Sequence, residues 1–337
     1  MVNIAVVGCG YWGPNLVRNF SSISECKMKK VCDTDVERLT YIKRLYSEVE
    51  TVSEFEQVVS APEIDAVAVA TPVRFHFEMA MKSLQAGKHT FIEKPMASSV
   101  AECKELIEIA EKKNLILMVG HTFIYSTPVC KIKEIVDSGE LGRIQYISAR
   151  RLNLGLLQKD INVAWDLAPH DISIILYIMN ETPVSVNCQG KAHVNPDIED
   201  VTSMTLNFAR DGLATIQSSW LDPNKVREIT FVGNKKMLVY NDVEPIEKIK
   251  IYDKRVDIPS HYDTFAEFQY AYHYGDMYSP YLKLVEPLKV ECQHFLDCIR
   301  TGRKAQSGGI EGIRIIQILE AASQSLQNGG AEVKLSF

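Results

Sequence analysis

The chain opens with the stretch that decides its fold, VNIAVVGCGYWGPNLVRNF at residues 2–20. A short apolar strand leads there into Gly8, Gly10 and Gly13, and a helical pattern follows. In a G-x-G-x-x-G turn the first glycine permits the tight bend, the second lets the backbone approach a pyrophosphate, and the third lets helix and strand pack closely. The helix N-terminus then offers free N–H groups and a favourable dipole to phosphates. We therefore expect a dinucleotide to contact five residues of this loop: Gly8, Gly10, Tyr11, Trp12 and Gly13.

An acidic residue after the second predicted strand indicates which dinucleotide binds. The predicted strand 28–32 leads directly to Asp33, about twenty residues after Gly13. A carboxylate there accepts hydrogen bonds from both ribose hydroxyls of the adenosine and repels a 2′-phosphate. The sequence therefore predicts NAD rather than NADP as the cofactor. Arg38 lies near enough in sequence to accommodate a phosphate or contact the cofactor; alternatively it is an exposed helix residue.

The composition excludes several classes of function. A chain of 337 residues predicts about two domains. The net charge of −6 and the lack of a basic block argue against nucleic acid and membranes as partners. The sequence contains no run of eighteen apolar residues and no cleavable leader, which predicts a cytoplasmic protein. Its eight cysteines form no C-x-x-C, so we expect buried thiols and no metal site.

Alternating strand and helix patterns predict the fold class of the first part of the chain. Short strands separated by helices indicate an α/β Rossmann domain with a parallel sheet, which we assign to residues 1–121. The dinucleotide is then expected at the carboxyl ends of the strands.

The pattern changes after Pro128. Strand patterns joined by short turns, such as the turn at 210–212, predict a second domain of the α+β class with antiparallel pairing over residues 122–337. Helices are expected in this domain at 165–179, 287–301 and 309–327. The stretch 261–281 is dense in Tyr and Phe and fits no period, which favours core or subunit packing over a substrate wall.

Two turns at predicted strand ends carry candidate site residues. Glu93, Lys94 and Pro95 follow an apolar strand, at the edge of the sheet where ligand-contacting residues belong in this fold. The proline stiffens that turn. Thr71 and Pro72 end an earlier strand. We expect the cofactor to contact both turns and the start of the next helix, through Thr71, Pro72, His76, Glu93 and Lys94.

A strongly apolar helix is predicted to begin at Trp165 and carries two polar residues of interest. Asp166 and His170 are four residues apart and so share a helical face. Pro169 is then expected in the first turn, where its missing N–H costs little. The positive end of the helix would keep His170 neutral and able to accept a proton. The alternative is that Asp166 caps the helix and His170 is structural.

Four segments together resemble the Gfo/Idh/MocA oxidoreductases: VVGCGYWG, SLQAGKHTFIEKP, the D-x-x-x-H from Asp166 to His170, and SGGIEGIRIIQILEAA. The resemblance covers nearly the whole chain and implies a Rossmann domain followed by an open, largely antiparallel sheet. It implies that Lys94, Asp166 and His170 are the catalytic trio. His170 would take the proton of a substrate hydroxyl, while Lys94 and Asp166 hold that hydroxyl against the nicotinamide.

Two departures from the family pattern limit what the resemblance implies. Residues 162–165 read NVAW where many relatives carry two glycines, which implies a differently shaped pocket entrance. Val73 stands where many relatives have asparagine. Neither departure touches the trio.

The resemblance also implies a substrate. The segments 153–171 and 275–288 are similar to members found among surface-polysaccharide genes, which implies a nucleotide sugar oxidised at C3, such as UDP-N-acetylglucosamine. The implied substrate contacts are Lys94, His121, Tyr125, Arg151, Asn153, Asp166 and His170. Four cationic side chains are available to bind a diphosphate; alternatively they form a solvated basic face. They are Arg150, Arg151, Lys159 and Lys191.

Other interpretations stay open at this point. The substrate could be a free sugar or cyclitol, or the enzyme could reduce a keto-sugar nucleotide. A non-catalytic NAD-binding regulator is a third possibility, against which the intact trio argues. We expect the chain to form a homodimer or homotetramer.

Overall fold

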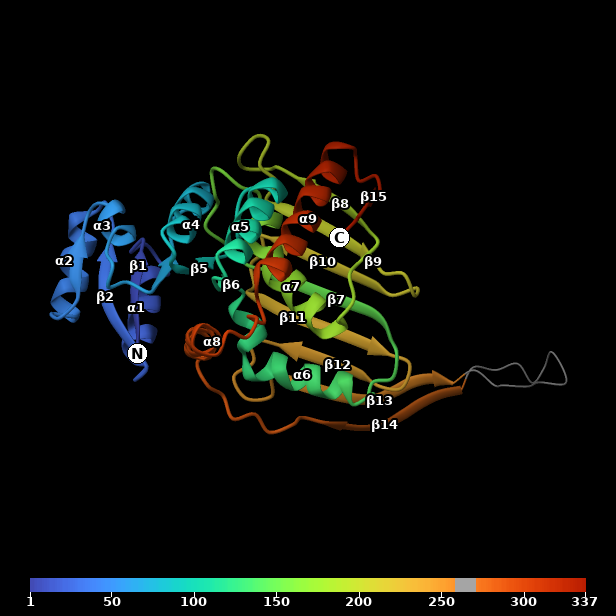
Figure 1. Ribbon diagram of the computed structural model, residues 1–337. Helices are drawn as coiled ribbons and strands as arrows, with labels where there is room; N and C mark the ends of the chain where they lie inside the picture. The colour runs from blue at the N-terminus through green and yellow to red at the C-terminus, as the bar shows by residue number, and fades with distance from the viewer. Residues whose placement is uncertain (258–270) are drawn as a thin grey trace, which may run out of the picture. The chain divides into compact units, whose positions relative to one another are not determined.

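The computed structural model describes residues 1–257 and 271–337, and the chain divides into two compact units (Figure 1). Unit 1 comprises Met1–Ser126 and Val285–Glu320, and unit 2 comprises Thr127–Leu284 and Ala321–Phe337. The sequence analysis placed Val285–Glu320 in the second domain, whereas these residues cluster with the first unit.

Aromatic packing explains why this late segment belongs to unit 1. Helix α8 (Pro287–Thr301) carries Phe295, which is fully buried. Its ring centroid lies 6.4 Å from that of Phe20 and 5.8 Å from that of Phe91, both in edge-on geometry. Edge-to-face aromatic pairs stabilise a core beyond the area that they bury. Such long-range contacts leave no trace in local sequence periodicity.

A six-stranded parallel sheet forms the centre of unit 1, in the order β3-β2-β1-β4-β5-β6. Its strands are β1 (Val2–Val7), β2 (Cys26–Cys32), β3 (Glu50–Val52), β4 (Ala66–Val69), β5 (His89–Glu93) and β6 (Leu117–Gly120). The strand order reverses between β1 and β4, and this reversal creates the crevice in which such sheets bind ligands. The predicted α/β Rossmann fold is confirmed.

Helices connect these strands, as right-handed crossovers between parallel strands require. They are α1 (Gly13–Ser21), α2 (Val36–Leu45), α3 (Glu56–Val59), α4 (His76–Gln85) and α5 (Val100–Lys112), with short 3-10 turns η1 (Val73–Phe75) and η2 (Thr122–Tyr125). Every residue of β4 is buried, which explains its uniformly apolar sequence AVAV. Strand β3 was not predicted, because only Val52 of its three residues is buried.

A nine-stranded sheet forms the centre of unit 2, in the order β14-β13-β12-β11-β7-β10-β9-β8-β15. Its strands are β7 (Ile144–Leu152), β8 (Ser185–Lys191), β9 (Val201–Asn207), β10 (Leu213–Ser219), β11 (Val226–Gly233), β12 (Met237–Asn241), β13 (Ile249–Asp257), β14 (Ala271–Tyr278) and β15 (Val333–Lys334). The strands pair antiparallel except β7 with β10. The sheet is open, with β14 and β15 at its edges (Figure 1), which confirms the predicted α+β class.

Helices α6 (Thr127–Asp137) and α7 (Val163–Met179), with the end of α9 (Gly309–Gln327), accompany this sheet in unit 2. Helix α7 packs on β7, β9 and β10. Burial alternates along the strands, so that one face of the sheet is covered and the other is more exposed. Strand β14 lies in the aromatic stretch for which no period was found, and residues 261–270 of that stretch lie outside the described residues. Within residues 1–257 and 271–337, no helix is long and apolar enough to span a membrane.

Candidate active site

The glycine loop after β1 has the geometry that a dinucleotide requires. Gly8 has φ +95°, and a Cβ on it would lie 2.6 Å from the carbonyl oxygen of Ala70. A Cβ on Gly13 would meet the carbonyl oxygen of Gly8. A Cβ on Gly10, in contrast, would have no protein atom within 4 Å among the described residues. Packing therefore requires the first and third glycines, while the second leaves open space over the backbone for a pyrophosphate.

The aromatic residues between these glycines project from the loop. Tyr11 is 84% exposed, and its ring stands edge-on to that of Trp12 at 5.4 Å between centroids. Nothing in unit 1 covers Tyr11, so it remains a predicted cofactor contact.

Asp33 is held beside the glycine loop by two main-chain donors. The N–H of Cys9 donates to Oδ2, and the N–H of Asp35 donates to Oδ1 at 2.8 Å. The carboxylate is buried and lies 3.7 Å from the guanidinium of Arg38, which pairs more closely with Asp35 at 3.2 Å. Asp33 is thus fixed at the end of β2, where it can accept hydrogen bonds from ribose hydroxyls.

Several buried polar atoms lie at the carboxyl ends of β4, β5 and β6. Thr71 Oγ1, Glu93 Oε1 and both ring nitrogens of His121 find no hydrogen-bond partner in the part of the chain that the structure describes. Buried polar groups normally pair with protein, water or ligand. These atoms follow three neighbouring strands at the ligand-binding edge of the sheet, so the residues present fit a polar cofactor. Thr71 and Glu93 were predicted to contact the cofactor and His121 to contact the substrate.

Burial also shifts the pKa values of Glu93 and His121. It raises the pKa of Glu93 to about 7, against the opposing effect of the neighbouring Lys94. Burial, together with the charge of Lys94, lowers the pKa of His121 to about 3. His121 is therefore neutral near pH 7, and each of its ring nitrogens either donates or accepts one hydrogen bond.

Sequence reasoning missed Glu291, a buried acid of unit 1 in addition to Asp33 and Glu93. It projects from α8, and its Oε2 accepts a hydrogen bond from Thr122 Oγ1 at 2.7 Å. Burial and the nearby Glu93 hold its pKa well above the ordinary range. A signal was available in the sequence, because Glu291 lies on the apolar face of the predicted helix, between Leu288 and Phe295.

Two other predicted residues of unit 1 are engaged within the protein. The Tyr125 hydroxyl lies 2.9 Å from Ser307 Oγ, and burial raises its pKa. The two ring nitrogens of His76 lie against main-chain carbonyls of Thr71 and Pro95.

In unit 2, helix α7 begins two residues earlier than the sequence predicted. The side chain of Asn162 caps it by accepting from the N–H of Trp165 at 3.1 Å. Pro169 therefore lies in the second turn, so the prediction of a first-turn proline is wrong. Asp166 is not the cap, and His170 lies two turns from the helix start. The helix dipole therefore has little effect on His170, because this effect falls off within the first turn of a helix.

Asp166 and His170 keep the spacing that places them on one face of α7. Asp166 Oδ2 accepts a hydrogen bond from Trp220 Nε1 at 3.1 Å. Trp220 follows β10 and is fully buried, so it orients the Asp166 carboxylate from the sheet. The sequence carried no signal for this partner.

Arg151, a predicted substrate contact, is bound by Asp171 on α7. Nε donates to Oδ2 at 2.8 Å and Nη2 donates to Oδ1 at 2.9 Å, and both residues are almost fully buried. Although burial opposes its charge, the Asp171 carboxylate keeps the pKa of Arg151 above its ordinary value. The pair ties the helix of Asp166 and His170 to strand β7.

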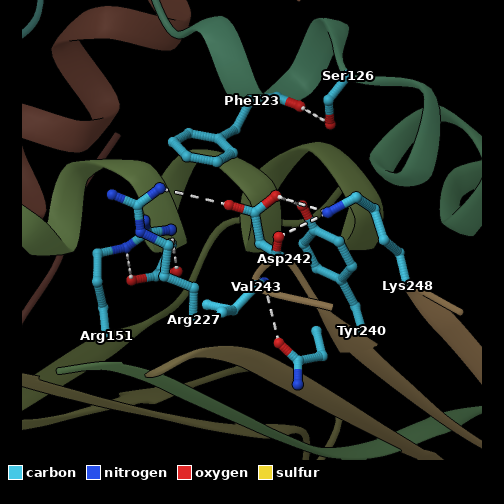
Figure 2. A network of polar contacts seen from close by, with 10 residues as sticks. Phe123, Ser126, Arg151, Arg227, Tyr240, Asp242, Val243 and Lys248 are labelled. Carbon is cyan, nitrogen blue, oxygen red and sulfur yellow. Dashed lines mark hydrogen bonds and ion pairs between the residues drawn. The ribbon is translucent and has the colours of Figure 1, made fainter. Parts of the chain in front are cut away.

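A second polar cluster lies beside Arg151, on the face of the nine-stranded sheet that carries this residue (Figure 2). Its centre is Asp242, which accepts from the Tyr240 hydroxyl at 3.0 Å and pairs with Arg227 at 3.4 Å. Lys248 Nζ donates to the main-chain oxygen of Asp242 at 2.6 Å. Asn153, also a predicted substrate contact, follows β7, and its N–H donates to the carbonyl of Ser219.

Comparisons with known proteins agree with this architecture. The family described as "Oxidoreductase family, NAD-binding Rossmann fold" matches residues 2–121, and the "GFO/IDH/MocA C-terminal domain" matches residues 129–239. The UDP-N-acetylglucosamine 3-dehydrogenase of Acidithiobacillus ferrooxidans is 24% identical over 92% of this chain and 93% of that relative. Its solved structure superimposes with a TM-score of 0.79 at 21% identity, covering 97% of this chain and 98% of that one.

Other similar proteins are named for, or were solved with, different compounds. The myo-inositol 2-dehydrogenase of Thermotoga maritima is 23% identical over 97% of this chain and 96% of its own length. An Agrobacterium radiobacter oxidoreductase solved with NAD+, L-tartaric acid and magnesium has a TM-score of 0.80 at 17% identity, covering 99% of this chain and 98% of that one. The chain belongs to the Gfo/Idh/MocA family of oxidoreductases, and its residues 2–121 form an NAD-binding Rossmann fold.

Proposed function

We propose that this protein is an NAD-dependent dehydrogenase that oxidises a secondary hydroxyl of a sugar, with C3 of UDP-N-acetylglucosamine as the first substrate to test. The observation that carries the proposal is the unpaired, buried polar group of Thr71, Glu93 and His121 around the turn that bears Lys94. A cofactor-binding regulator would not need Lys94 at that edge together with Asp166 and His170 on α7. The relatives support dehydrogenation and include enzymes named for sugar and cyclitol substrates.

The proposed chemistry assigns one role to each member of the trio. NAD, when bound, accepts a hydride from the carbinol carbon. His170 takes the hydroxyl proton, so that loss of a hydride and a proton leaves a ketone. Lys94 donates to the reacting oxygen and stabilises its developing negative charge. Asp166, oriented by Trp220, holds the same hydroxyl.

The diphosphate of a nucleotide sugar needs cationic partners outside the nicotinamide site. Arg151 is engaged by Asp171, whereas Arg150, Lys159 and Lys191 are exposed. These three residues therefore remain the candidates for contacts with the diphosphate. We retain a free sugar or cyclitol as the alternative, because the inositol dehydrogenase relative matches this chain as well as the nucleotide-sugar enzyme does.

We also propose that copies of the chain associate as a homodimer or homotetramer. Strand β14, at the edge of its sheet, exposes Tyr272 and Tyr274, and exposed aromatic residues favour protein contacts. Light scattering on the purified protein tests this, and a monomer at all concentrations would contradict it.

A substrate panel tests the proposed function. Purified protein is incubated with NAD and with UDP-N-acetylglucosamine, free N-acetylglucosamine or myo-inositol, and NADH is followed by its absorbance. We expect the nucleotide sugar to be oxidised far faster than the free sugar, because the remote nucleotide contributes binding energy that orients C3. Activity on myo-inositol with none on any nucleotide sugar would favour the alternative.

A further inference from the structure

His76 bridges the two turns that carry the candidate nicotinamide-side residues. It is the first residue of α4, and it is 1% exposed. Nδ1 lies 2.8 Å from the main-chain oxygen of Pro95, and Nε2 lies 2.7 Å from that of Thr71. Thr71 follows β4 and Pro95 follows β5, so a single ring connects the ends of two neighbouring strands.

The ring extends the connection beyond the sheet. Strands β4 and β5 pair as far as Val69 and Ile92, and each strand then leads into a separate turn. A main-chain carbonyl in a turn is held only where a donor reaches it. Since His76 is buried, water is a poor substitute for its N–H, and losing the donor leaves a buried carbonyl unpaired.

The protonation of the ring decides how many bonds it donates. A neutral imidazole has one N–H and an imidazolium has two. Burial lowers the pKa of His76, the carbonyls of Pro95 and Thr71 oppose this shift, and the charge of Lys94 adds to it. The lowered pKa favours a neutral ring that donates one strong bond.

The turn after β5 has a buried side and an accessible side. Pro95 is buried, whereas Lys94 beside it is partly exposed. A donor that holds the Pro95 carbonyl therefore anchors the turn at the residue next to Lys94. Small displacements of a catalytic group are costly, since a shift of about 1 Å can lower the rate about 100-fold.

We infer that His76 is a positioning residue whose Nδ1–H holds the Pro95 carbonyl and thereby fixes the placement of Lys94. The inference rests on the proposed function, because that proposal puts Lys94 at the reacting hydroxyl. It assigns His76 a role through Lys94 rather than a direct contact with the cofactor.

Two substitutions separate the two contacts of the ring. The amide nitrogen of asparagine falls near the position of Nδ1, and that of glutamine falls near Nε2. His76→Asn therefore keeps a donor for Pro95, and His76→Gln keeps a donor for Thr71. Glu78→Gln, an exposed change on the same helix, is the control.

Two measurements are made on the intact protein. The first is kcat and KM with UDP-N-acetylglucosamine and NAD. The second is amide hydrogen exchange, by mass spectrometry, of peptides spanning 70–75 and 93–98. We expect His76→Gln to lower kcat about 100-fold, with KM less affected, and to speed exchange in 93–98. We expect His76→Asn to stay within about threefold of wild type in kcat and to exchange like the wild type in 93–98.

Several outcomes would overturn the inference. Equal kcat in the Asn and Gln variants is one, and wild-type exchange of 93–98 in His76→Gln is another. If the wild type oxidises no member of the substrate panel, the proposed function fails, and the exchange data still decide whether His76 holds the turn. If either variant does not fold, imidazole ¹⁵N–¹H spectra of the wild type are used: a slowly exchanging Nδ1–H supports the inference, and a rapidly exchanging one refutes it.

Discussion

The buried pair of Arg151 and Asp171 allows a quantitative test of how α7 is held. Both residues are almost fully buried, at 5% and 1% exposure, and two hydrogen bonds of 2.8 and 2.9 Å join them. Asp171→Asn removes the carboxylate that accepts both guanidinium hydrogen bonds, so the buried charge of Arg151 loses this counter-ion. Breaking a buried pair in this way costs about 3–5 kcal/mol in the free energy of unfolding.

Replacing both partners has a different expected outcome. In the double variant Arg151→Met with Asp171→Leu, neither charge of the pair remains. Replacing a buried ion pair by apolar residues often leaves the free energy of unfolding unchanged. The double variant is therefore expected to be more stable than Asp171→Asn alone. Glu134→Gln on α6 is the control: it breaks the exposed ion pair with Lys131, and exposed pairs contribute about 0–1 kcal/mol.

The assay is urea unfolding followed by tryptophan fluorescence. Of the three tryptophans only Trp12 lies in unit 1, so Trp12→Phe in every variant leaves Trp165 and Trp220 to report on unit 2. The reasoning is refuted if the free energy of unfolding of Asp171→Asn lies within about 1 kcal/mol of its parent, or if the double variant is no more stable than Asp171→Asn.

Three further predictions concern unit 1 and the trio. The pKa of Glu93, raised from 4.5 to about 7, means that the folded state holds a proton that the unfolded state releases, so stability is lost as pH rises from about 4.5 to about 7. A difference of this size corresponds to about 3 kcal/mol, so Glu93→Gln should flatten the pH dependence of the free energy of unfolding in urea over this range, and an unchanged slope would contradict the assignment. Asp33→Ser should narrow the preference for NAD over NADP in Kd measurements, and a wild type that prefers NADP would overturn that role. His170→Ala and Lys94→Ala should lower kcat about 10²- to 10⁴-fold, with NAD affinity largely kept in the His170 variant, and near-normal turnover would remove the residue from the mechanism.

Local chemistry explains which features could be predicted from the sequence. The glycine loop, Asp33 and the turn at Glu93 depend on residue types at short, fixed spacings, and the structure holds Asp33 beside the glycine loop. The parallel pairing of the strands in unit 1 followed from the alternation of strands and helices, because parallel strands need crossovers.

Long-range contacts account for what was missed. Asn162 begins α7 before Trp165, and a single capping hydrogen bond moved Pro169 into the second turn. Asp166 and Trp220 are 54 residues apart, and no periodicity links an indole N–H to its acceptor over such a separation. The ion pair of Arg151 likewise joins a strand to a helix across an intervening loop, so its cationic side chain was indistinguishable in the sequence from a ligand contact.

The contact of Phe295 with Phe20 and Phe91 has a consequence for synthesis on the ribosome. The strands of the Rossmann sheet emerge first, but the ring that completes their core lies on α8, which follows every strand of the second sheet except β15. At about 5–20 residues per second, α8 follows β6 only after roughly ten to forty seconds. During this interval the nascent chain exposes the apolar surface that α8 later covers. Such surface is what chaperones bind and what aggregation begins from, so the yield of native protein should depend on translation speed over residues 127–286.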